Sequence, residues 1–192
     1  MARSKEFEEQ AVLDKAMKLF WEQGYEKTSM NDLVEHMGIH RRSLYDTFTD
    51  KHTLFLRAID RFDERISARL TAGVKRSKTA KEAVRFVFDF MIYGEEDVPP
   101  GCMIVNSAAE LAMRDGEVDA KAVCAFEKSE GLLTEIVSWG QQNGEFTTDY
   151  EAKELAESLH NAMTGIRVMV RTSVSKEKIE RIANQAMRIL EK

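Results

Sequence analysis

Residues 38–55, GIHRRSLYDTFTDKHTLF, place two consecutive arginines at the expected start of a short helix. Leu44 and Phe48 follow at the spacing of one apolar helix face. Backbone N–H groups in the first turn of a helix already carry partial positive charge, so Arg41 and Arg42 each oppose the helix dipole by roughly 0.3–1 kcal/mol. Folding alone does not require cations at this position. The pair therefore indicates a negatively charged partner.

Two helical patterns precede this stretch. The apolar face of the first consists of Leu13, Ala16, Met17 and Phe20. Gly24 is placed to end that helix in a left-handed cap, and Ser29 with Asp32 three residues later predicts a capping box that starts the second helix. Gly38 closes the second helix. Two short helices joined by a turn are typical of the helix-turn-helix motif, whose shared apolar side the first helix would cover.

In a helix-turn-helix protein the second helix of the motif lies in the major groove, with its N-terminal residues near the base edges. Arg41 and Arg42 would therefore reach guanine edges or phosphates. Two ordinary readings remain open. The arginines can form a solvated surface, and Arg42 can simply pair with Asp46 one turn later.

The segment from Val12 to Leu54 resembles the N-terminal domain of the tetracycline-repressor-like (TetR/AcrR) family of bacterial transcriptional regulators. The similarity lies in AMKLFWEQGYEKTSMNDLV, MGIHRRSLYDTF and DKHTLF. The resemblance implies that Tyr45 and Lys51 bind phosphate, that Thr28 or Ser29 does so at the second helix, and that the start of the third helix faces bases or backbone. The DNA-binding set it implies is Thr28, Ser29, His40, Arg41, Arg42, Ser43, Tyr45 and Lys51.

Two residues depart from the family pattern. His40 stands where a small hydroxyl residue usually caps the third helix, and Arg42 stands where glycine is common. The His40 ring can accept a bond from a backbone N–H or donate one to a phosphate, although histidine caps less well than Ser or Thr. Both changes enlarge the surface that would read DNA. The operator sequence of a relative therefore cannot be assigned to this chain.

Composition favours an all-α protein, since the chain of 192 residues has two prolines and ten glycines. We expect about nine helices, with a three-helix DNA-binding domain at residues 1–50 and a helical ligand-binding and dimerisation domain at residues 51–192. The later helices are expected at about 51–71, 79–93, 102–113, 117–142, 149–173 and 175–191. The break GEEDVPPG separates the second of these from the third.

Charge and motifs narrow the function. The net charge is −5, and residues 1–60 hold nine basic and eleven acidic side chains, so DNA contact must depend on a local patch. The four histidines do not share a helix face for a metal, and no nucleophile motif or phosphate-binding glycine loop is present. We therefore expect no cofactor, no metal and no catalysis. No apolar run is long enough to span a membrane, so a cytoplasmic protein is expected.

The TetR-like resemblance implies a dimer interface on the last two long helices. One apolar stripe contains Gly165, which suits close helix contact, and the two stripes would form a four-helix interface across a two-fold axis. The alternative is that both stripes are buried inside a monomer. The expected interface residues are Leu155, Leu159, Ala162, Ile166, Val170, Ile179, Ile182 and Ala186.

The same resemblance implies a small-molecule pocket in the C-terminal domain. Polar residues in apolar surroundings, above all Asn106 and His160, are the better candidates for ligand contacts, whereas an aromatic residue or methionine is more often plain core. The candidate lining is Phe86, Phe90, Met103, Asn106, Phe126, Trp139, His160 and Met163. Cys102 opens a helix after VPPG, and we expect a structural role for it rather than that of a redox or electrophile sensor.

The leading hypothesis is a dimeric repressor that binds a palindromic double-stranded DNA operator and is released by an unknown small-molecule effector. In such a mechanism the ligand changes the spacing of the two DNA-binding domains, which must match half-sites about 34 Å apart or a multiple of that distance. Two other classes stay open at this stage. They are a helical interaction protein with a vestigial DNA-binding domain and a small helical enzyme.

Overall fold

The structure is a computed structural model that describes residues 8–94 and 97–192. These residues form nine α-helices and one 3₁₀ turn, with no strand among them, so the expected all-α fold is confirmed. The helices are α1 (Glu9–Gln23), α2 (Met30–Met37), α3 (Arg41–Phe48), α4 (Lys51–Arg76), α5 (Ala80–Tyr93), α6 (Met103–Leu111), α7 (Gly116–Gln142), α8 (Ala152–Met169) and α9 (Lys176–Met187), followed by the 3₁₀ turn η1 (Arg188–Leu190).

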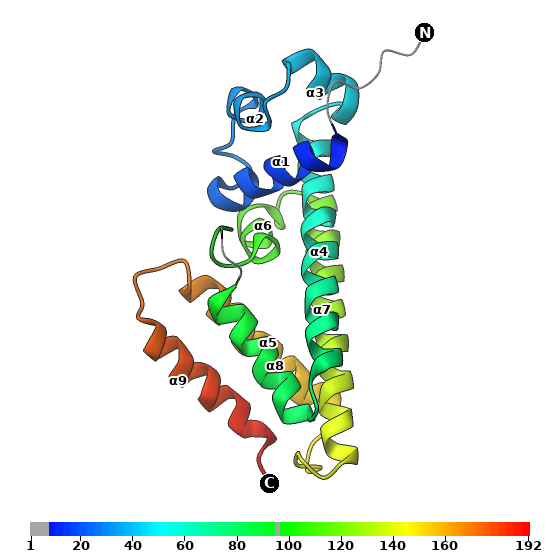
Figure 1. Ribbon diagram of the computed structural model, residues 1–192, viewed down its shortest axis with the longest axis vertical. Helices are drawn as coiled ribbons and strands as arrows, with labels where there is room; N and C mark the ends of the chain where they lie inside the picture. The colour runs from blue at the N-terminus through cyan, green and yellow to red at the C-terminus, as the bar shows by residue number, and fades with distance from the viewer. Residues whose placement is uncertain (1–7, 95–96) are drawn as a thin grey trace.

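Helices α1–α3 lie at one end of an elongated molecule (Figure 1). Their boundaries follow local chemistry. The Ser29 hydroxyl accepts from the Asp32 N–H at 3.1 Å and the Asp32 carboxylate accepts from the Ser29 N–H at 2.8 Å, which confirms the capping box. Gly38 ends α2 with φ 71° and ψ 36°, a left-handed conformation that glycine adopts without strain. Gly24 has φ 84° but ψ 175°, so it ends α1 without the expected left-handed cap.

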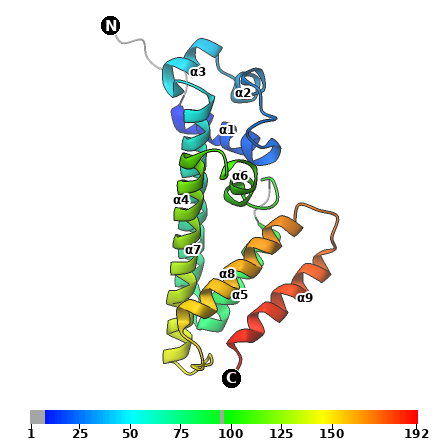
Figure 2. The same cartoon turned by 180° about the vertical axis from the view of Figure 1, so that it is seen from behind.

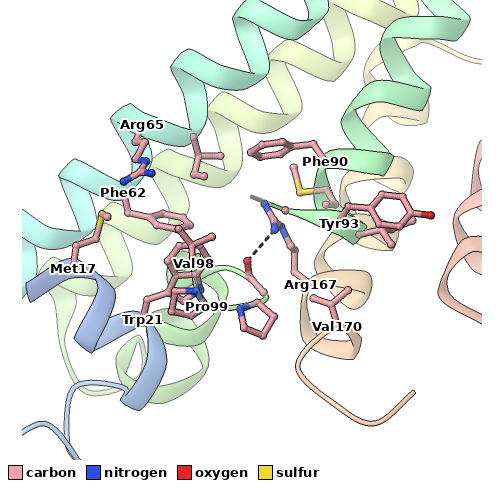
Figure 3. Close-up of a pocket in the computed structure, with 16 residues that line it drawn as sticks. Met17, Trp21, Phe62, Arg65, Phe90, Tyr93, Val98, Pro99, Arg167 and Val170 are labelled. Atoms are coloured by element: carbon pink, nitrogen blue, oxygen red, sulfur yellow. Dashed lines mark hydrogen bonds between the residues drawn. The ribbon is translucent and has the colours of Figure 1, made fainter. Parts of the chain in front are cut away.

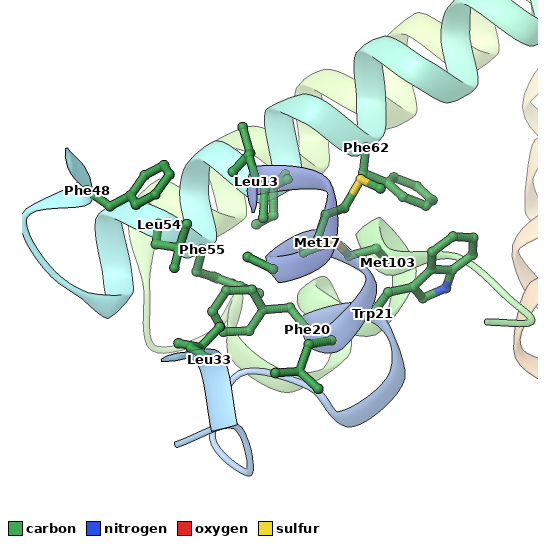
Figure 4. Close-up of a cluster of buried hydrophobic side chains, with 14 of the residues drawn as sticks. Leu13, Met17, Phe20, Trp21, Leu33, Phe48, Leu54, Phe55, Phe62 and Met103 are labelled. Atoms are coloured by element: carbon green, nitrogen blue, oxygen red, sulfur yellow. The ribbon is translucent and has the colours of Figure 1, made fainter. Parts of the chain in front are cut away.

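Helices α4 and α7 run side by side along the long axis and connect the two ends of the molecule (Figures 1 and 2). Two buried clusters lie on this pair, and Ile66 of α4 packs against both. The first cluster joins α1–α3 to the first half of α4 and to α6 (Figure 4). We call this unit the head. The second cluster joins the rest of α4 to α5, α8, α9 and the end of α7, and we call this unit the body.

The boundary at residue 50 stays a prediction, but the packing does not divide there. Leu54, Phe55 and Phe62 of α4 lie in the same buried cluster as Phe20 and Trp21 of α1. Their rings pack edge to face, with centroids 5.0 Å apart for Phe20 and Phe55 and 4.9 Å for Trp21 and Phe62. A movement of α4 would therefore move the head with it.

The expected dimer stripes face the interior of the protomer. Leu155, Leu159, Ile166 and Ile179 are at most 5% exposed and belong to the core of the body. These four side chains were wrongly placed on a dimer surface, because the packing of α5, α7, α8 and α9 against one another already covers them. The four remaining candidates are partly buried; they are Ala162, Val170, Ile182 and Ala186. The last three pack against the same core.

Candidate functional site

The N-terminal end of α3 carries the expected cationic surface. Arg41 and Arg42 are exposed, and Tyr45 one turn later is 44% exposed. The Arg42 Nε lies 3.7 Å from a carboxylate oxygen of Asp46, with side chains 90% and 70% exposed. An ion pair this open to water contributes little to stability. The guanidinium is therefore free to exchange Asp46 for a phosphate or a base.

His40 and Ser43 border the arginines. His40 is the N-cap of α3 by its backbone, with φ −72° and ψ 145°, but its ring makes no capping hydrogen bond. The exposed ring thus stays available on the surface of the head. Ser43 is half-buried between the exposed arginines and Leu44, which is fully buried. These positions leave His40 and the arginines as the outermost side chains of this end of α3.

Thr28 is a correction to the expected DNA-binding set. Its side chain is fully buried, and its hydroxyl donates to the Gly24 carbonyl oxygen at 2.6 Å. This hydrogen bond braces the turn between α1 and α2, and the hydroxyl does not face solvent. Ser29, by contrast, is exposed at the start of α2, where two orphan N–H groups and the helix dipole favour an anion.

Lys51 begins α4, as expected, and its Nζ lies 4.1 Å above the centre of the Tyr25 ring. Partial burial against this ring lowers the pKa of the Lys51 ammonium, and the carboxylates of Glu26 and Glu110 oppose that effect. The ammonium lies beside the N-terminus of α4. This position is compatible with a phosphate contact made together with the exposed end of α3.

Two small cavities lie where the head meets the body. The first, of about 90 Å³, lies between α1, α4, α5, α8 and the segment 98–101 and is partly open to solvent (Figure 3). The second, of about 60 Å³, lies between α4, α6, α7 and α8 and is also partly open. Four residues line both: Phe62, Ile66, Met91 and Arg167. The expected lining residues Phe90, Phe126, His160 and Met163 are brought together here.

Four other expected lining residues lie elsewhere. The Phe86 ring packs on the backbone of Gly73, where an added Cβ would meet a ring carbon at 2.0 Å. Met103 is 1% exposed in the core of the head, and Trp139 packs against the core of the body. Asn106 borders neither cavity, although its Nδ2 is buried without a hydrogen-bond partner among the described residues. The apolar character of a residue in the sequence therefore did not show whether it belongs to the core or lines a cavity.

His160 of the second cavity has a specific partner. Its Nδ1 lies 3.0 Å from a carboxylate oxygen of Glu130 on α7. Its ring also packs 5.4 Å from the ring of Phe126, centre to centre. The Glu130 carboxylate accepts the Nδ1–H, so the tautomer with the proton on Nδ1 is favoured when the ring is neutral. The Nε2 atom would then be a hydrogen-bond acceptor.

Arg167 is the functional candidate that sequence reasoning missed. It is 5% exposed, lines both cavities, and donates from Nη1 to the Gly101 carbonyl oxygen at 2.9 Å (Figure 3). Burial lowers the pKa of its guanidinium, and the nearby Cys102 opposes this shift. The signal was present in the sequence, because an arginine four residues after Met163 continues the apolar stripe of α8.

Polar contacts join α1 to α6 within the head, α4 to the start of α7, and the head to the body. Glu110 of α6 accepts from the N–H groups of Tyr25 and Glu26, at 2.9 and 2.8 Å. The His52 Nε2 on α4 lies 2.7 Å from a carboxylate oxygen of Asp115, the N-cap of α7. Arg171, just after α8, donates to the last turn of α1. The cavities and the surface of α3 thus belong to one packed unit.

Comparison with known proteins decides the family. Residues 12–58 match the family model "Bacterial regulatory proteins, tetR family", and residues 80–186 match "Tetracyclin repressor-like, C-terminal domain". The chain belongs to the TetR family. It is accordingly a transcriptional regulator, and the TetR family consists of regulators rather than enzymes. The second match covers most of the C-terminal part of the chain, whereas the sequence motifs that resembled the family lie between Val12 and Leu54.

The relatives agree over the whole length. The HTH-type transcriptional repressor ComR of Escherichia coli (strain K12) is 33% identical over an alignment of 190 residues that covers 97% of this chain and 90% of ComR. The uncharacterized HTH-type transcriptional regulator YezE of Bacillus subtilis (strain 168) is 29% identical over 201 residues, covering all of both chains. A CifR cysteine mutant solved with 26-bp double-strand operator DNA superposes with a TM-score of 0.86 at 25% identity, covering 97% of this chain and 98% of that one.

Among residues 8–94 and 97–192, no group of three or more His, Cys, Asp or Glu side chains is placed to hold a metal ion. None of the described helices is long and apolar enough to cross a membrane.

Proposed function

We propose that this TetR-family member is a homodimeric repressor that binds a two-fold-symmetric operator and releases it when a small molecule enters the cavities between head and body. The observation that carries this proposal is that Met17 and Trp21 of the head line the first cavity together with Arg167 and Val170 of the body. A ligand bound there would touch both units at once. The likeness to a regulator solved with operator DNA and to the repressor ComR supports the DNA-binding half.

The end of α3 would read the operator. Arg41 and Arg42 would enter the major groove at the start of the recognition helix, and Tyr45, Lys51 and Ser29 would hold the phosphates on either side. Each head must meet one half-site of the operator. If the separation of the two heads changed by a few ångströms, only one head could bind its half-site and the other would lose its contact with DNA. The ligand then releases the DNA if it binds more tightly to the arrangement of the heads that does not fit the operator than to the one that does.

The exposed face of α8 is the proposed dimer surface. Val168 is 52% exposed, and a Cβ added at Gly165 one turn earlier would meet nothing within 4 Å. A bare glycine beside an exposed valine lets a second helix approach closely. The proposed surface therefore lies on α8, one of the two helices first expected, but on the face that points away from the core.

Fluorescence anisotropy with DNA from upstream of the gene, after footprinting has located the operator, tests the proposal. The double variant Arg41→Ala/Arg42→Ala should lose at least tenfold in affinity, since each base or phosphate contact contributes about 1–3 kcal/mol. Arg76→Ala, which removes an exposed arginine at the far end of α4, is the matched control and should bind normally. Affinity should fall steeply with salt. Normal operator binding by the double variant would show that α3 is not the reading helix.

A further inference from the structure

Arg167 is a buried cation that the protomer leaves incompletely paired. Its Nε–H is buried and has no hydrogen-bond partner among the described residues, and no described carboxylate forms an ion pair with it. The guanidinium donates a hydrogen bond to the Gly101 carbonyl oxygen, and its central carbon lies 5.7 Å from the centre of the Phe90 ring. Burying a cation without a counter-charge costs several kcal/mol. Packing alone would favour an apolar residue at this position of α8.

A second unpaired donor belongs to a residue that lines the first cavity. The Trp21 indole Nε1–H is buried without an acceptor in the part of the chain that the structure describes. Trp21 extends into the wall of the first cavity from α1 and Arg167 from α8 (Figure 3). Two buried N–H donors that lack acceptors are expensive in a folded protein, and such groups usually mark a missing partner. The partner must supply acceptors.

The remaining walls show what else that partner needs. Most of the lining is apolar, including Phe62, Ile66 and Met91, which border both cavities. The Asp63 carboxylate at the second cavity is already paired with the Lys128 Nζ at 2.6 Å. A guanidinium binds a carboxylate through two parallel hydrogen bonds, and it does so most strongly where water is excluded. The walls therefore suit an apolar molecule with one anionic end.

We propose that Arg167 anchors the carboxylate of a small organic acid whose apolar part fills the cavities, so that the effector is an organic anion. The proposal rests on the proposed function in calling this ligand the effector; the site itself follows from Arg167 and Trp21. The cavities, of about 90 and 60 Å³, set the size. The two cavities share Phe62, Ile66, Met91 and Arg167, and an engineered apolar cavity of about 150 Å³ accepts benzene, so one aromatic ring or a short alkyl chain is the size class to test.

Isothermal titration calorimetry on the full chain without DNA provides the test. The acids are benzoate, phenylacetate and hexanoate, and the matched neutral probes are benzamide, phenylacetamide and hexanamide. At least one acid should bind at millimolar concentration or below, and its amide should bind at least about tenfold more weakly. Arg167→Met should abolish that preference, whereas Arg167→Lys should keep part of it. Arg76→Met removes an exposed arginine far from both cavities and should leave acid binding unchanged.

Arg167→Met should fold, because it replaces a buried and incompletely paired cation with an apolar side chain of similar length. A second readout does not depend on that variant. In wild-type protein labelled with ¹⁵N, the side-chain Nε–H resonance that disappears in Arg167→Lys should move on addition of the acid and stay in place on addition of the amide. This signal reports on the guanidinium itself, and a merely structural arginine would not give it.

The outcomes separate this inference from the proposed function. Amides that bind as tightly as acids, a preference that survives Arg167→Met, or no acid binding at millimolar concentration would each overturn the anion site. Operator binding is measured on the same samples by fluorescence anisotropy. Failure to bind operator DNA would overturn the repressor proposal and leave the anion site standing. Acid binding that leaves operator affinity unchanged would keep the site but remove its role as effector site.

Discussion

Arg171 donates from Nη1 to the carbonyl oxygen of Trp21 at 3.0 Å, across 150 residues of chain. Its Nη2 donates to the Glu22 carbonyl at 3.1 Å. Both acceptors belong to the last turn of α1, where carbonyl groups lack partners within the helix and where the dipole favours a cation. Arg171 follows Arg167 by four residues. The end of α8 therefore contacts a cavity with one arginine and the head with the next.

Arg171→Met should loosen the head from the body. The last turn of α1 would lose two charge-assisted hydrogen bonds, and because Arg171 is exposed we expect the free energy of unfolding to fall by only about 1 kcal/mol. Hydrogen exchange should accelerate in α1 near Trp21 more than in α5. Arg181→Met, which removes an exposed arginine of α9, is the control. Equal protection of α1 in both variants would show that Arg171 does not connect the two units.

Thr28 and Ser29, adjacent in sequence, should respond differently to substitution. Thr28→Val removes the buried bond to the Gly24 carbonyl, which should lower the free energy of unfolding by about 1 kcal/mol without changing the salt dependence of operator binding. Ser29→Ala removes the cap of α2, at a cost of about 0.5–2 kcal/mol, and an exposed hydroxyl beside the proposed phosphate contact. Denaturant unfolding and salt titration of DNA binding measure the two effects. A reduced salt slope in Thr28→Val would return Thr28 to the DNA-binding set.

The head could be predicted because its signals are local. The bonds of Ser29 with Asp32 and the positive φ of Gly38 lie within a few residues of each other, so the sequence pattern carries them directly. The arginines of α3 stand out for the same reason: they oppose the dipole of their own helix.

The faces of the body could not be predicted in this way. In the sequence, the apolar stripe through Leu159 and Ile166 would suit a dimer interface and the interior of one protomer equally well. Only the packing of α8 against α5 and α7 shows that the stripe faces the interior. The cavities depend on long-range contacts in the same way. Gly73 gives Phe86 a place to pack that nothing near Phe86 in sequence reveals.

Val168→Glu tests the revised dimer surface. The change would place a charge on the exposed face of α8, so the protomer should stay folded while the dimer weakens by several kcal/mol if that face is buried against a second copy. Val123→Glu is the control, because Val123 is 45% exposed on α7. Sedimentation should give folded monomer for the first variant and dimer for the second.

Ile166→Glu does not serve this purpose. Ile166 is fully buried in the protomer, so a carboxylate there would unfold the body whether or not it dimerises. If Val168→Glu remained a tight dimer, the interface would have to lie on another surface.

Asp115 should make the junction between α4 and α7 sensitive to acid. Partial burial raises the pKa of its carboxyl, but hydrogen bonds from the Val118 N–H, the His52 ring and the Glu117 N–H outweigh this, and the pKa lies below its ordinary value. The folded state therefore favours the carboxylate. Its contribution to stability is present above the ordinary aspartate pKa of about 3.9 and is lost as the pH falls through the lower folded value.

Asp115→Asn should accordingly reduce the free energy of unfolding at neutral pH and flatten its decline on acidification. The measurement is denaturant unfolding between about pH 7 and about pH 3. Asp119→Asn removes a charge from the same first turn of α7 without breaking the contact with His52 and is the control. The same acid dependence in wild type and Asp115→Asn would place the sensitive carboxylate elsewhere, for example at Asp50, whose hydrogen bond from the Thr53 N–H also lowers its pKa.

Cys102 should be structural rather than a sensor. It is the N-cap of α6, partly buried at the wall of the second cavity, and its thiol makes no capping bond. Cys124 is exposed on α7, so alkylation at neutral pH should label it first. Cys102→Ser should keep operator affinity unchanged, because the proposed DNA-binding surface does not use the thiol. Labelling of Cys102 faster than Cys124, together with loss of operator binding in wild type but not in Cys102→Ser, would instead make the thiol the entry point of the signal.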